Sequence, residues 1–399
     1  MERNALIAVF DPAAMSAEDL GAVERYLAGF ARVIRVDASG CSGAQALHER
    51  LRQHADEAAG VQLFGTPDAV PAFRVRYRVQ LTAGVDEGGM ICTDLFYGNL
   101  SNEERLIGET YSVKDHLLRG WPVDLIPRWP VARLPLRKGE FRSFLDRHEA
   151  FQRKNGCRQL DKAVFYNPLL PARRPRDDMG RFLKRVSGEM DSVRYRLYGN
   201  LKGEYPVIAN VLGDFSAENM ALENRRGVWE YIICSHGQRG NIDACYFENR
   251  EEKRLSTLNM ENIHTVLGRN PYYLDAVTCL NGFDMADNLT TAALNGQCLG
   301  MFAATTILST NGMDWQASPQ DMARSNFYYF YDHYFRALHE GACRGQAFFR
   351  AQRAYALALT EDAKRPLRAA GNVQFNLYNL LCYHNFGVLE RTETPCVPF

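Results

Sequence analysis

The chain has 399 residues, of which 46% are hydrophobic and 24% charged, as in an ordinary globular protein of one or two domains. Its 47 basic and 47 acidic residues balance, which argues against a protein that binds nucleic acid or another polyanion. The apolar run at 5–10 follows Glu2 and is too short for a signal-peptide core, and no run approaches the ~18 residues of a membrane span. The sequence therefore predicts a cytoplasmic protein without a membrane segment.

Ten cysteines are spread along the chain, at positions 41, 92, 157, 234, 245, 279, 298, 343, 382 and 396. They contain no C-x-x-C pair and do not have the spacing of a small disulfide-linked secreted domain. We expect most of them to be reduced and buried, and the spacing indicates no metal site.

The first 75 residues alternate between strand and helix patterns, which predicts a parallel sheet with right-handed crossovers. Ser16 is an N-cap candidate, and Asp19 lies where a capping box requires an acceptor. The expected elements are a strand at 5–10, a helix at about 17–31, a strand at 32–36, a helix at about 43–58, a strand at 60–64, a turn at 65–71 and a hairpin with a loop at 74–100.

A Pro-rich stretch at 127–135 reads as an extended segment, and an amphipathic helix follows at 140–154. The Asn155-Gly156 pair then breaks the pattern. We expect the domain boundary there, with an N-terminal α/β subdomain at 1–155 and a second subdomain at 156–399.

The second half repeats the alternation, and its last apolar segment, 373–389, is expected to pack back on the core. The expected strands are at 162–166, 205–209, 228–235, 273–278 and 299–307, with a hairpin at 240–247; the expected helices are at about 179–192, 216–225, 260–267, 284–294, 320–340 and 344–359.

Two strands of this half lead directly into residues whose side chains can take part in catalysis, His236 and Cys279. In an open α/β sheet, ligand-binding and catalytic residues lie just beyond the carboxyl ends of the strands. If the two strands are neighbours, the imidazole and the thiol lie side by side, as a thiol nucleophile and its base require. Taken alone, a Cys that ends an apolar strand is most often a core residue, and a His beside a Gly is usually a turn residue.

Around this pair, a series of motifs resembles the gingipain-type cysteine peptidases, within the caspase-like group. The motifs occur in the family's order along nearly the whole chain, and from the resemblance we expect a catalytic domain without a leader or the family's immunoglobulin-like domain. They are FGTPDAVP at 64–71, TDLFY at 93–97, ARLP at 132–135, the strand into His236-Gly237, CLNG at 279–282, LSTNGMDWQASP at 308–319 and NFGVLE at 385–390.

The resemblance implies a caspase/gingipain-like α/β fold: two adjacent α/β subdomains with mostly parallel sheets flanked by helices. It implies a cysteine endopeptidase that acts on a protein substrate. Cys279 would attack the peptide carbonyl, and His236 would activate the thiol or protonate the leaving amine. The backbone N–H groups of Gly237 and Cys279 would form the oxyanion hole. A catalytically silent sensor or binding module on the same fold is the alternative. A nucleotide-binding protein is disfavoured because no strand leads into a Gly-rich phosphate loop.

For substrate specificity, the resemblance places an acid before the helix at 179–192, where Asp178 is the nearer match and Asp177 lies beside it. Such a carboxylate would pair with an Arg or Lys at P1, although Asp at a helix start is also a common N-cap. Cys234, Val277 and Trp315 are expected to line the pocket.

One departure from the family concerns the group that assists the histidine. Arg-specific relatives carry a Glu at the end of the strand matched by 162–166, but no carboxylate occurs here. We therefore expect a backbone carbonyl or Asn167 to orient His236.

The basic, Pro-rich loop at 171–176 is either a solvated loop or an activation site of a zymogen. Cleavage would follow Arg174 or Arg176, of which Arg174 is the poorer candidate because Pro175 follows it. No cofactor is expected to be required. Structural calcium occurs among gingipain relatives, but no loop here demands it. The sequence gives no oligomeric state.

Overall fold

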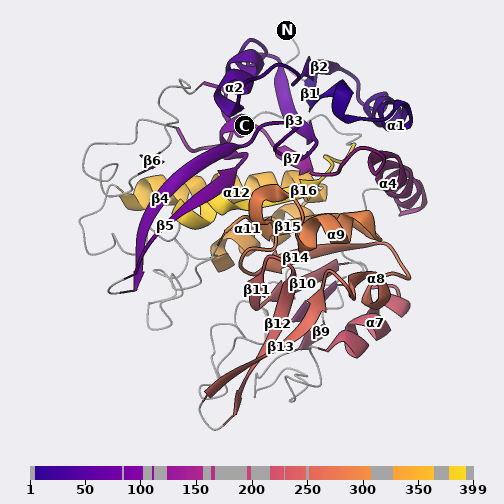
Figure 1. Ribbon diagram of the computed structural model, residues 1–399, viewed down its shortest axis with the longest axis vertical. Coiled ribbons are helices and arrows are strands. Elements are labelled where there is room, and N and C mark those ends of the chain that lie inside the picture. The colour runs from indigo at the N-terminus through magenta and orange to yellow at the C-terminus, as the bar shows by residue number, and fades with distance from the viewer. Residues whose placement is uncertain are drawn as a thin grey trace. The chain divides into compact units, whose positions relative to one another are not determined.

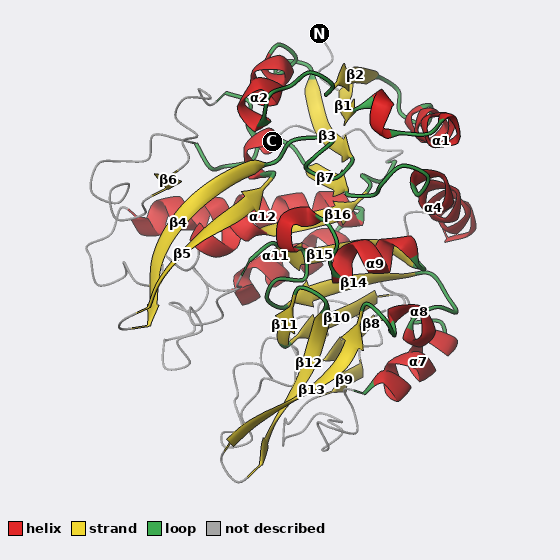
Figure 2. Cartoon of the chain, in the orientation of Figure 1, coloured by secondary structure: helices red, strands yellow, loops and turns green. Residues whose placement is uncertain are grey.

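A computed structural model describes residues 5–82, 85–101, 110–111, 124–155, 163–166, 196–198, 216–228, 230–248, 251–306, 327–363 and 377–391 (Figures 1 and 2). The chain forms two compact units. The first unit combines Met1–Leu145 with Leu308–Phe399, and the second is Asp146–Ile307. The units thus differ from the two consecutive subdomains expected at 1–155 and 156–399, because the C-terminal segment packs with the N-terminal strands. Asn155 is the last residue of a helix.

Five parallel strands form the core of the first unit. Across the sheet they are β2 (Val33–Asp37), β1 (Ala5–Phe10), β3 (Ala58–Phe64), β7 (Val131–Leu134) and β16 (Tyr383–Gly387). Every residue of β1 is buried, as a central parallel strand covered on both faces requires. The Pro-rich stretch expected to be merely extended supplies β7, and the apolar C-terminal segment supplies β16.

Helices of the first unit pack on this sheet through aromatic side chains. They are α1 (Ala17–Leu27), α2 (Ala44–Arg52) and the start of α4 (Phe141–Asn155), with a short 3-10 turn η1 (Pro12–Ala14). The ring of Phe64 in β3 makes edge contacts with Tyr26 of α1 and Phe141 of α4. The capping box of Ser16 and Asp19 is present, as predicted. Helix α2 ends earlier than expected because β3 already begins at residue 58.

The C-terminal part of the first unit is a helical pair, α11 (Phe327–His339) and α12 (Arg344–Ala363), followed by β16. Gly341, with φ of +94°, lies in the short connection between them. The ring of Phe330 in α11 contacts Phe348 and Tyr355 of α12 and Tyr383 of β16. This aromatic cluster therefore joins the helices to the sheet.

A separate three-stranded sheet of the first unit contains the expected hairpin. The hairpin strands are β4 (Phe73–Thr82) and β5 (Val85–Thr93), drawn as a long ribbon in Figure 1, and β4 also pairs with β6 (Thr110–Tyr111). The 3-10 turn η2 (Leu95–Gly98) follows β5 and is fully buried.

The described residues of the second unit also form a parallel sheet, with β9 (Arg196–Tyr198), β8 (Ala163–Tyr166), β10 (Glu230–Cys234), β14 (Tyr272–Val277) and β15 (Cys298–Ala304). A small antiparallel sheet consists of β11 (His236–Gln238), β12 (Asn241–Glu248) and β13 (Glu251–Asn259). Helices in the described part of this unit are α7 (Ala217–Arg225), α8 (Ile263–Val266) and α9 (Leu289–Asn295), with the 3-10 turn η4 (Phe283–Met285).

Helix α9 lies against β15 and begins later than expected. A helix was predicted at about 284–294, but Asp284, Met285 and Asp287 have positive φ angles, which an α-helix excludes. Asn288 then caps α9 and accepts a hydrogen bond from the backbone N–H of Thr291. The expected helix at 179–192 and strand at 205–209 lie outside the described residues.

Candidate active site

The strands that lead to His236 and Cys279 are neighbours in the parallel sheet of the second unit. Strand β10 pairs with β14, and the last pair in the register is Cys234 with Val277. His236 and Cys279 each lie two residues beyond that pair. The two candidate catalytic residues therefore extend from matching positions at the carboxyl edge of one sheet, as an α/β site requires.

Gly237 packs directly against the segment that carries Cys279. A Cβ atom on residue 237 would lie 2.8 Å from the carbonyl oxygen of Cys279 and 2.9 Å from Cβ of Thr278. These separations are shorter than van der Waals contact, so only glycine fits here. The absence of a side chain lets the backbone after His236 approach the backbone at Cys279.

The two candidate catalytic residues differ in burial from the strands that precede them. His236 and Cys279 are half-buried, whereas Ile232, Ile233 and Ala276 are fully buried. Cys279 carries a thiol and is not part of a disulfide. Partial exposure is the setting of a reactive cysteine, since a buried thiol cannot meet a substrate.

The backbone after Cys279 adopts a strained conformation that the sequence did not predict. Leu280 has a φ of +61°, which is uncommon for a residue with a side chain. Two backbone hydrogen bonds hold this turn: Leu280 N–H donates to Thr306 O, and Gly282 N–H donates to Ala304 O, each at 2.9 Å. Backbone strain of this kind concentrates at functional sites. The signal for it in the sequence is weak, because no glycine marks position 280.

No protein-family description matches this sequence, and no curated protein matches it either. Solved structures do match. The crystal structure of the Arg-specific cysteine proteinase gingipain R (RgpB) has a TM-score of 0.57 and 13% identity; the match covers 97% of this chain and 77% of that one. The complex of Porphyromonas gingivalis RgpB pro- and mature domains has a TM-score of 0.58 and 13% identity, with 96% and 78% covered.

The chain has the gingipain-type, caspase-like peptidase fold. The fold class expected from the ordered motifs is thus confirmed. At 13% identity the likeness concerns the fold, and the roles of individual residues rest on the geometry of this chain.

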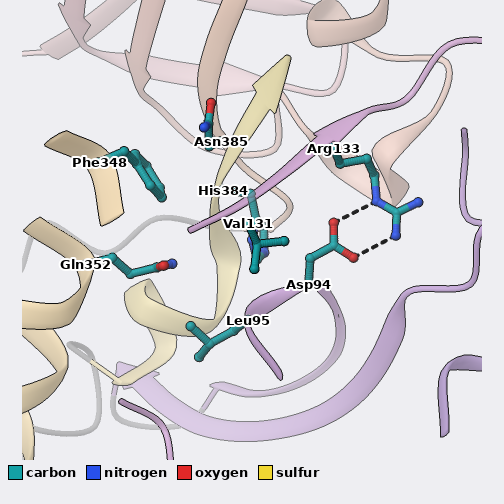
Figure 3. A pocket seen from close by; sticks show the side chains of 8 residues that line it. All are labelled: Asp94, Leu95, Val131, Arg133, Phe348, Gln352, His384 and Asn385. Atoms are coloured by element: carbon teal, nitrogen blue, oxygen red, sulfur yellow. Dashed lines mark hydrogen bonds and ion pairs between the residues drawn. The ribbon is translucent and has the colours of Figure 1, made fainter. Parts of the chain in front are cut away.

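Three of the motifs that carry the gingipain resemblance meet in the core of the first unit. Arg133 forms a two-pronged ion pair with Asp94, with Nε–Oδ2 at 2.6 Å and Nη2–Oδ1 at 2.7 Å (Figure 3). Its Nη1 also donates to the carbonyl oxygens of Gly65 at 2.9 Å and Val70 at 2.7 Å. Burial alone would lower the pKa of Arg133, but the Asp94 carboxylate raises it.

Both side chains of this ion pair are almost completely buried, and the guanidinium of Arg133 also donates to the surrounding backbone. In this chain these motifs therefore hold the first unit together, and they assign no catalytic group there. Breaking such a pair would leave a buried charge without compensation.

His384 lies beside the same ion pair and was not singled out from the sequence. It is 5% exposed, and burial lowers its pKa to about 4, against the opposing influence of the Asp94 carboxylate. The imidazole is therefore neutral at pH 7. It lines a small cavity of the first unit together with Asp94, Leu95, Val131, Arg133, Phe348, Gln352 and Asn385 (Figure 3).

The structure places only some of the residues predicted for the substrate pocket. Val277 is buried at the end of β14, and Cys234 is the last residue of β10. The remaining predicted residues lie outside the described part of the chain: Asp177, Asp178, Trp315, Asn167, Arg174 and Arg176. The pocket acid and the cleavage loop of a gingipain-type enzyme thus stay predictions.

Within the described ranges, no group of three or more His, Cys, Asp or Glu side chains could hold a metal ion. No helix among the same residues is long and apolar enough to cross a membrane.

Proposed function

We propose that the protein is a cysteine endopeptidase in which Cys279 and His236 form the catalytic dyad. One observation carries the proposal. In a chain with a peptidase fold, the ends of two paired strands carry a half-buried thiol and a half-buried imidazole, and Gly237 packs on the Cys279 backbone.

In the proposed reaction, the sulfur of Cys279 attacks the carbonyl carbon of the scissile peptide bond. A C–S bond forms, and the carbonyl electron pair moves to the oxygen, where the backbone N–H groups of Gly237 and Cys279 stabilise the negative charge. When the tetrahedral intermediate collapses, the C–N bond breaks and His236 gives its proton to the leaving amine. Water then attacks the acyl-enzyme, which releases the acid and restores the thiol.

A thiol with a pKa of about 8.5 is mostly protonated at neutral pH, so it needs a neighbouring group that accepts its proton. His236 follows the strand that pairs with the one leading to Cys279. The proposal therefore requires both side chains, and removing either one must abolish the reaction.

We further propose a basic P1 residue, held by Asp178 or Asp177, with Cys234, Val277 and Trp315 lining the pocket. An Arg side chain that binds a carboxylate inside a pocket forms charge-assisted hydrogen bonds, which are stronger than hydrogen bonds between neutral groups. Maturation of a zymogen by cleavage after Arg176, or less readily after Arg174, follows from the same specificity. These assignments are supported by the sequence resemblance and by the fold.

The test is a panel of fluorogenic peptides that differ only at P1, incubated with reduced protein. We expect cleavage after Arg or Lys, loss of more than about 1000-fold in Cys279→Ala and His236→Ala, and a comparable loss for Arg peptides in the variant that removes the pocket acid, Asp178→Asn or Asp177→Asn. Cys41→Ala is the matched control, because Cys41 is also a half-buried thiol but lies in the first unit. Intact mass of the same samples reports cleavage after Arg176.

Cleavage after other residues would remove the pocket assignment and keep the peptidase. Absence of cleavage of any peptide, by protein with a processed 171–176 loop, would contradict the proposal and favour the catalytically silent binding module.

A further inference from the structure

Asn281, two residues after Cys279, links the two loops of the candidate site. Its side chain is fully buried. The amide Nδ2 donates one hydrogen bond to the carbonyl oxygen of Gln238 at 2.6 Å and a second to that of Asn241 at 3.0 Å. Gln238 and Asn241 pair with each other across the tight turn between β11 and β12. Both N–H groups of the amide therefore bind the hairpin that begins at His236.

The oxygen of the same amide binds the strand end that leads to Cys279. Thr278 Oγ1 donates to Asn281 Oδ1, and Thr278 is 1% exposed. The carbonyl oxygen of Asn281 accepts hydrogen bonds from Oγ1 of Thr290 at 2.9 Å and from its N–H at 3.2 Å. Cys279 thus lies between two residues that are bonded to each other and anchored to the first turn of α9.

The pattern of donors and acceptors fixes the orientation of the amide. Two carbonyl oxygens face its nitrogen, and a hydroxyl donor faces its oxygen. A flipped amide would point its oxygen at these two carbonyl oxygens, and the part-buried carbonyls would lose the N–H groups that the amide gives them. The side chain can therefore hold only one arrangement of the two loops.

Other hydrogen bonds between these loops lie at the exposed tip of the turn. Arg239 Nε donates to Asp287 O at 2.8 Å, and Arg239 O accepts from Leu289 N–H at 2.9 Å. Arg239 itself is exposed, and a hydrogen bond that water can replace constrains geometry less than a buried one does. The buried amide is better suited to keep the loops at a fixed separation.

We propose that Asn281 is a positioning residue that holds the His236 hairpin against the Cys279 loop, so that imidazole and thiol stay within reach of proton transfer. This inference rests on the proposed function. Asn281 does not contact the reacting atoms in this role. A displacement of about 1 Å between reacting groups costs on the order of 100-fold in rate, so loss of the amide should act on kcat.

The variants are Asn281→Ala and the nearly isosteric Asn281→Asp, which loses both N–H donors. The matched control is Asn224→Ala. Asn224 is also fully buried in the second unit and also joins two segments: it donates to Asn270 O at 3.0 Å and accepts from Arg269 N–H at 3.2 Å. We expect kcat to fall about 100-fold in both Asn281 variants, with KM changed less than about threefold, whereas Asn224→Ala keeps kcat.

A second readout needs no substrate. The alkylation rate of Cys279 by iodoacetamide is followed against pH by mass spectrometry of its peptide. In the wild type, an adjacent imidazole gives the profile an inflection that disappears in His236→Ala. We expect Asn281→Ala to lose that inflection and Asn224→Ala to keep it.

The outcomes separate the two proposals. If the wild-type profile equals that of His236→Ala, the dyad is wrong, and the positioning role falls with it. If the wild type shows the inflection and Asn281→Ala keeps both it and kcat, the positioning role is overturned while the peptidase stands. If the Asn281 variants fail to fold, Thr278→Val and Thr278→Ser test the positioning role instead, because the Thr278 hydroxyl donates to Asn281. We expect Thr278→Val, which loses the hydroxyl, to lose at least tenfold more kcat than Thr278→Ser, and equal values would overturn the role.

Discussion

At the scale of single residues, the candidate site depends on close packing between two backbones. Gly237 shows this most directly, because its Cα faces the carbonyl group of Cys279. Its φ is not in the left-handed region, so the requirement at this position is for space rather than for unusual backbone angles. A side chain here would have to displace backbone atoms, which cannot rotate away as a flexible side chain can.

We predict that Gly237→Ala separates the two loops and lowers peptide cleavage by about 100-fold, with a loss of about 1–3 kcal/mol in the free energy of unfolding from overpacking. Steady-state kinetics and urea unfolding measure the two effects. Gly240→Ala is the control in the same hairpin, because its added Cβ would meet only the side chain of Met260, with Sδ at 3.3 Å. Equal activity of the two variants would show that the close approach at 237 is not needed for catalysis.

Part of this site could be predicted from the sequence, for a physical reason. Apolar strands that end in His236 and Cys279 belong to a parallel sheet, and the carboxyl ends of neighbouring parallel strands meet at one edge. The role of Asn281 and the positive φ of Leu280 could not be predicted. Both depend on which carbonyl groups the folded chain brings near, and local sequence does not encode that.

At the scale of secondary-structure elements, one carboxylate serves the N-termini of two helices. Asp19 completes the capping box of α1 with Ser16, and it also accepts hydrogen bonds from Gly139 N–H at 2.5 Å and Arg142 N–H at 3.2 Å, at the start of α4. Burial raises the pKa of Asp19, but these hydrogen bonds lower it overall. The carboxylate therefore ties together two helices that are more than 100 residues apart in the sequence.

We predict that Asp19→Ala lowers the free energy of unfolding by about 2–3 kcal/mol, since it removes the caps of two helices at once. The folded-state pKa lies below the unfolded value, so the contribution is present above pH 4 and is lost as the pH falls through the folded-state pKa. Urea unfolding at pH 7 measures it. Glu18→Ala is the control, because the neighbouring Glu18 pairs with Arg142 only at the exposed surface and should contribute about 0–1 kcal/mol. Equal losses in both variants would contradict the shared cap.

Elements with strong local signals were predicted well, and those set by tertiary pairing were not. The capping box and the apolar run of β1 are local features, and both are confirmed. Strand β7 was expected only as an extended segment, because its Pro-rich surroundings hide the strand pattern and its pairing with β3 and β16 is long-range. The start of α9 was misplaced because Asp284 and Asp287 give only a weak local signal for left-handed backbone, and Met285 gives none.

At the scale of the whole molecule, the fold is shared with structures whose sequences differ widely from this one. Identity to gingipain R is 13%, yet the matched part covers 97% of this chain. The motifs that remain recognisable include those that form the buried ion pair of Asp94 and Arg133, where a change at one residue leaves a buried charge. In this chain such a centre ties together three short segments of the first unit, which explains how ordered short motifs can indicate a fold that overall identity conceals.

The same buried centre gives the molecule a pH-dependent stability. His384 is neutral in the folded state because burial holds its pKa at about 4, whereas an unfolded chain has a histidine pKa of about 6.5. Between these values the unfolded state binds more protons, so stability is fully present above pH 6.5 and is lost as the pH falls towards 4. The free energy of unfolding of the wild type falls between pH 7 and pH 5. We predict that this decrease is about 2 kcal/mol smaller in His384→Gln. Urea unfolding at several pH values measures the difference, with His54→Gln, a half-buried histidine of the same unit, as control. If the free energy of unfolding has the same pH dependence in the wild type and in His384→Gln, this histidine is protonated in the folded state without cost. The conclusion that its buried imidazole is neutral would then be wrong.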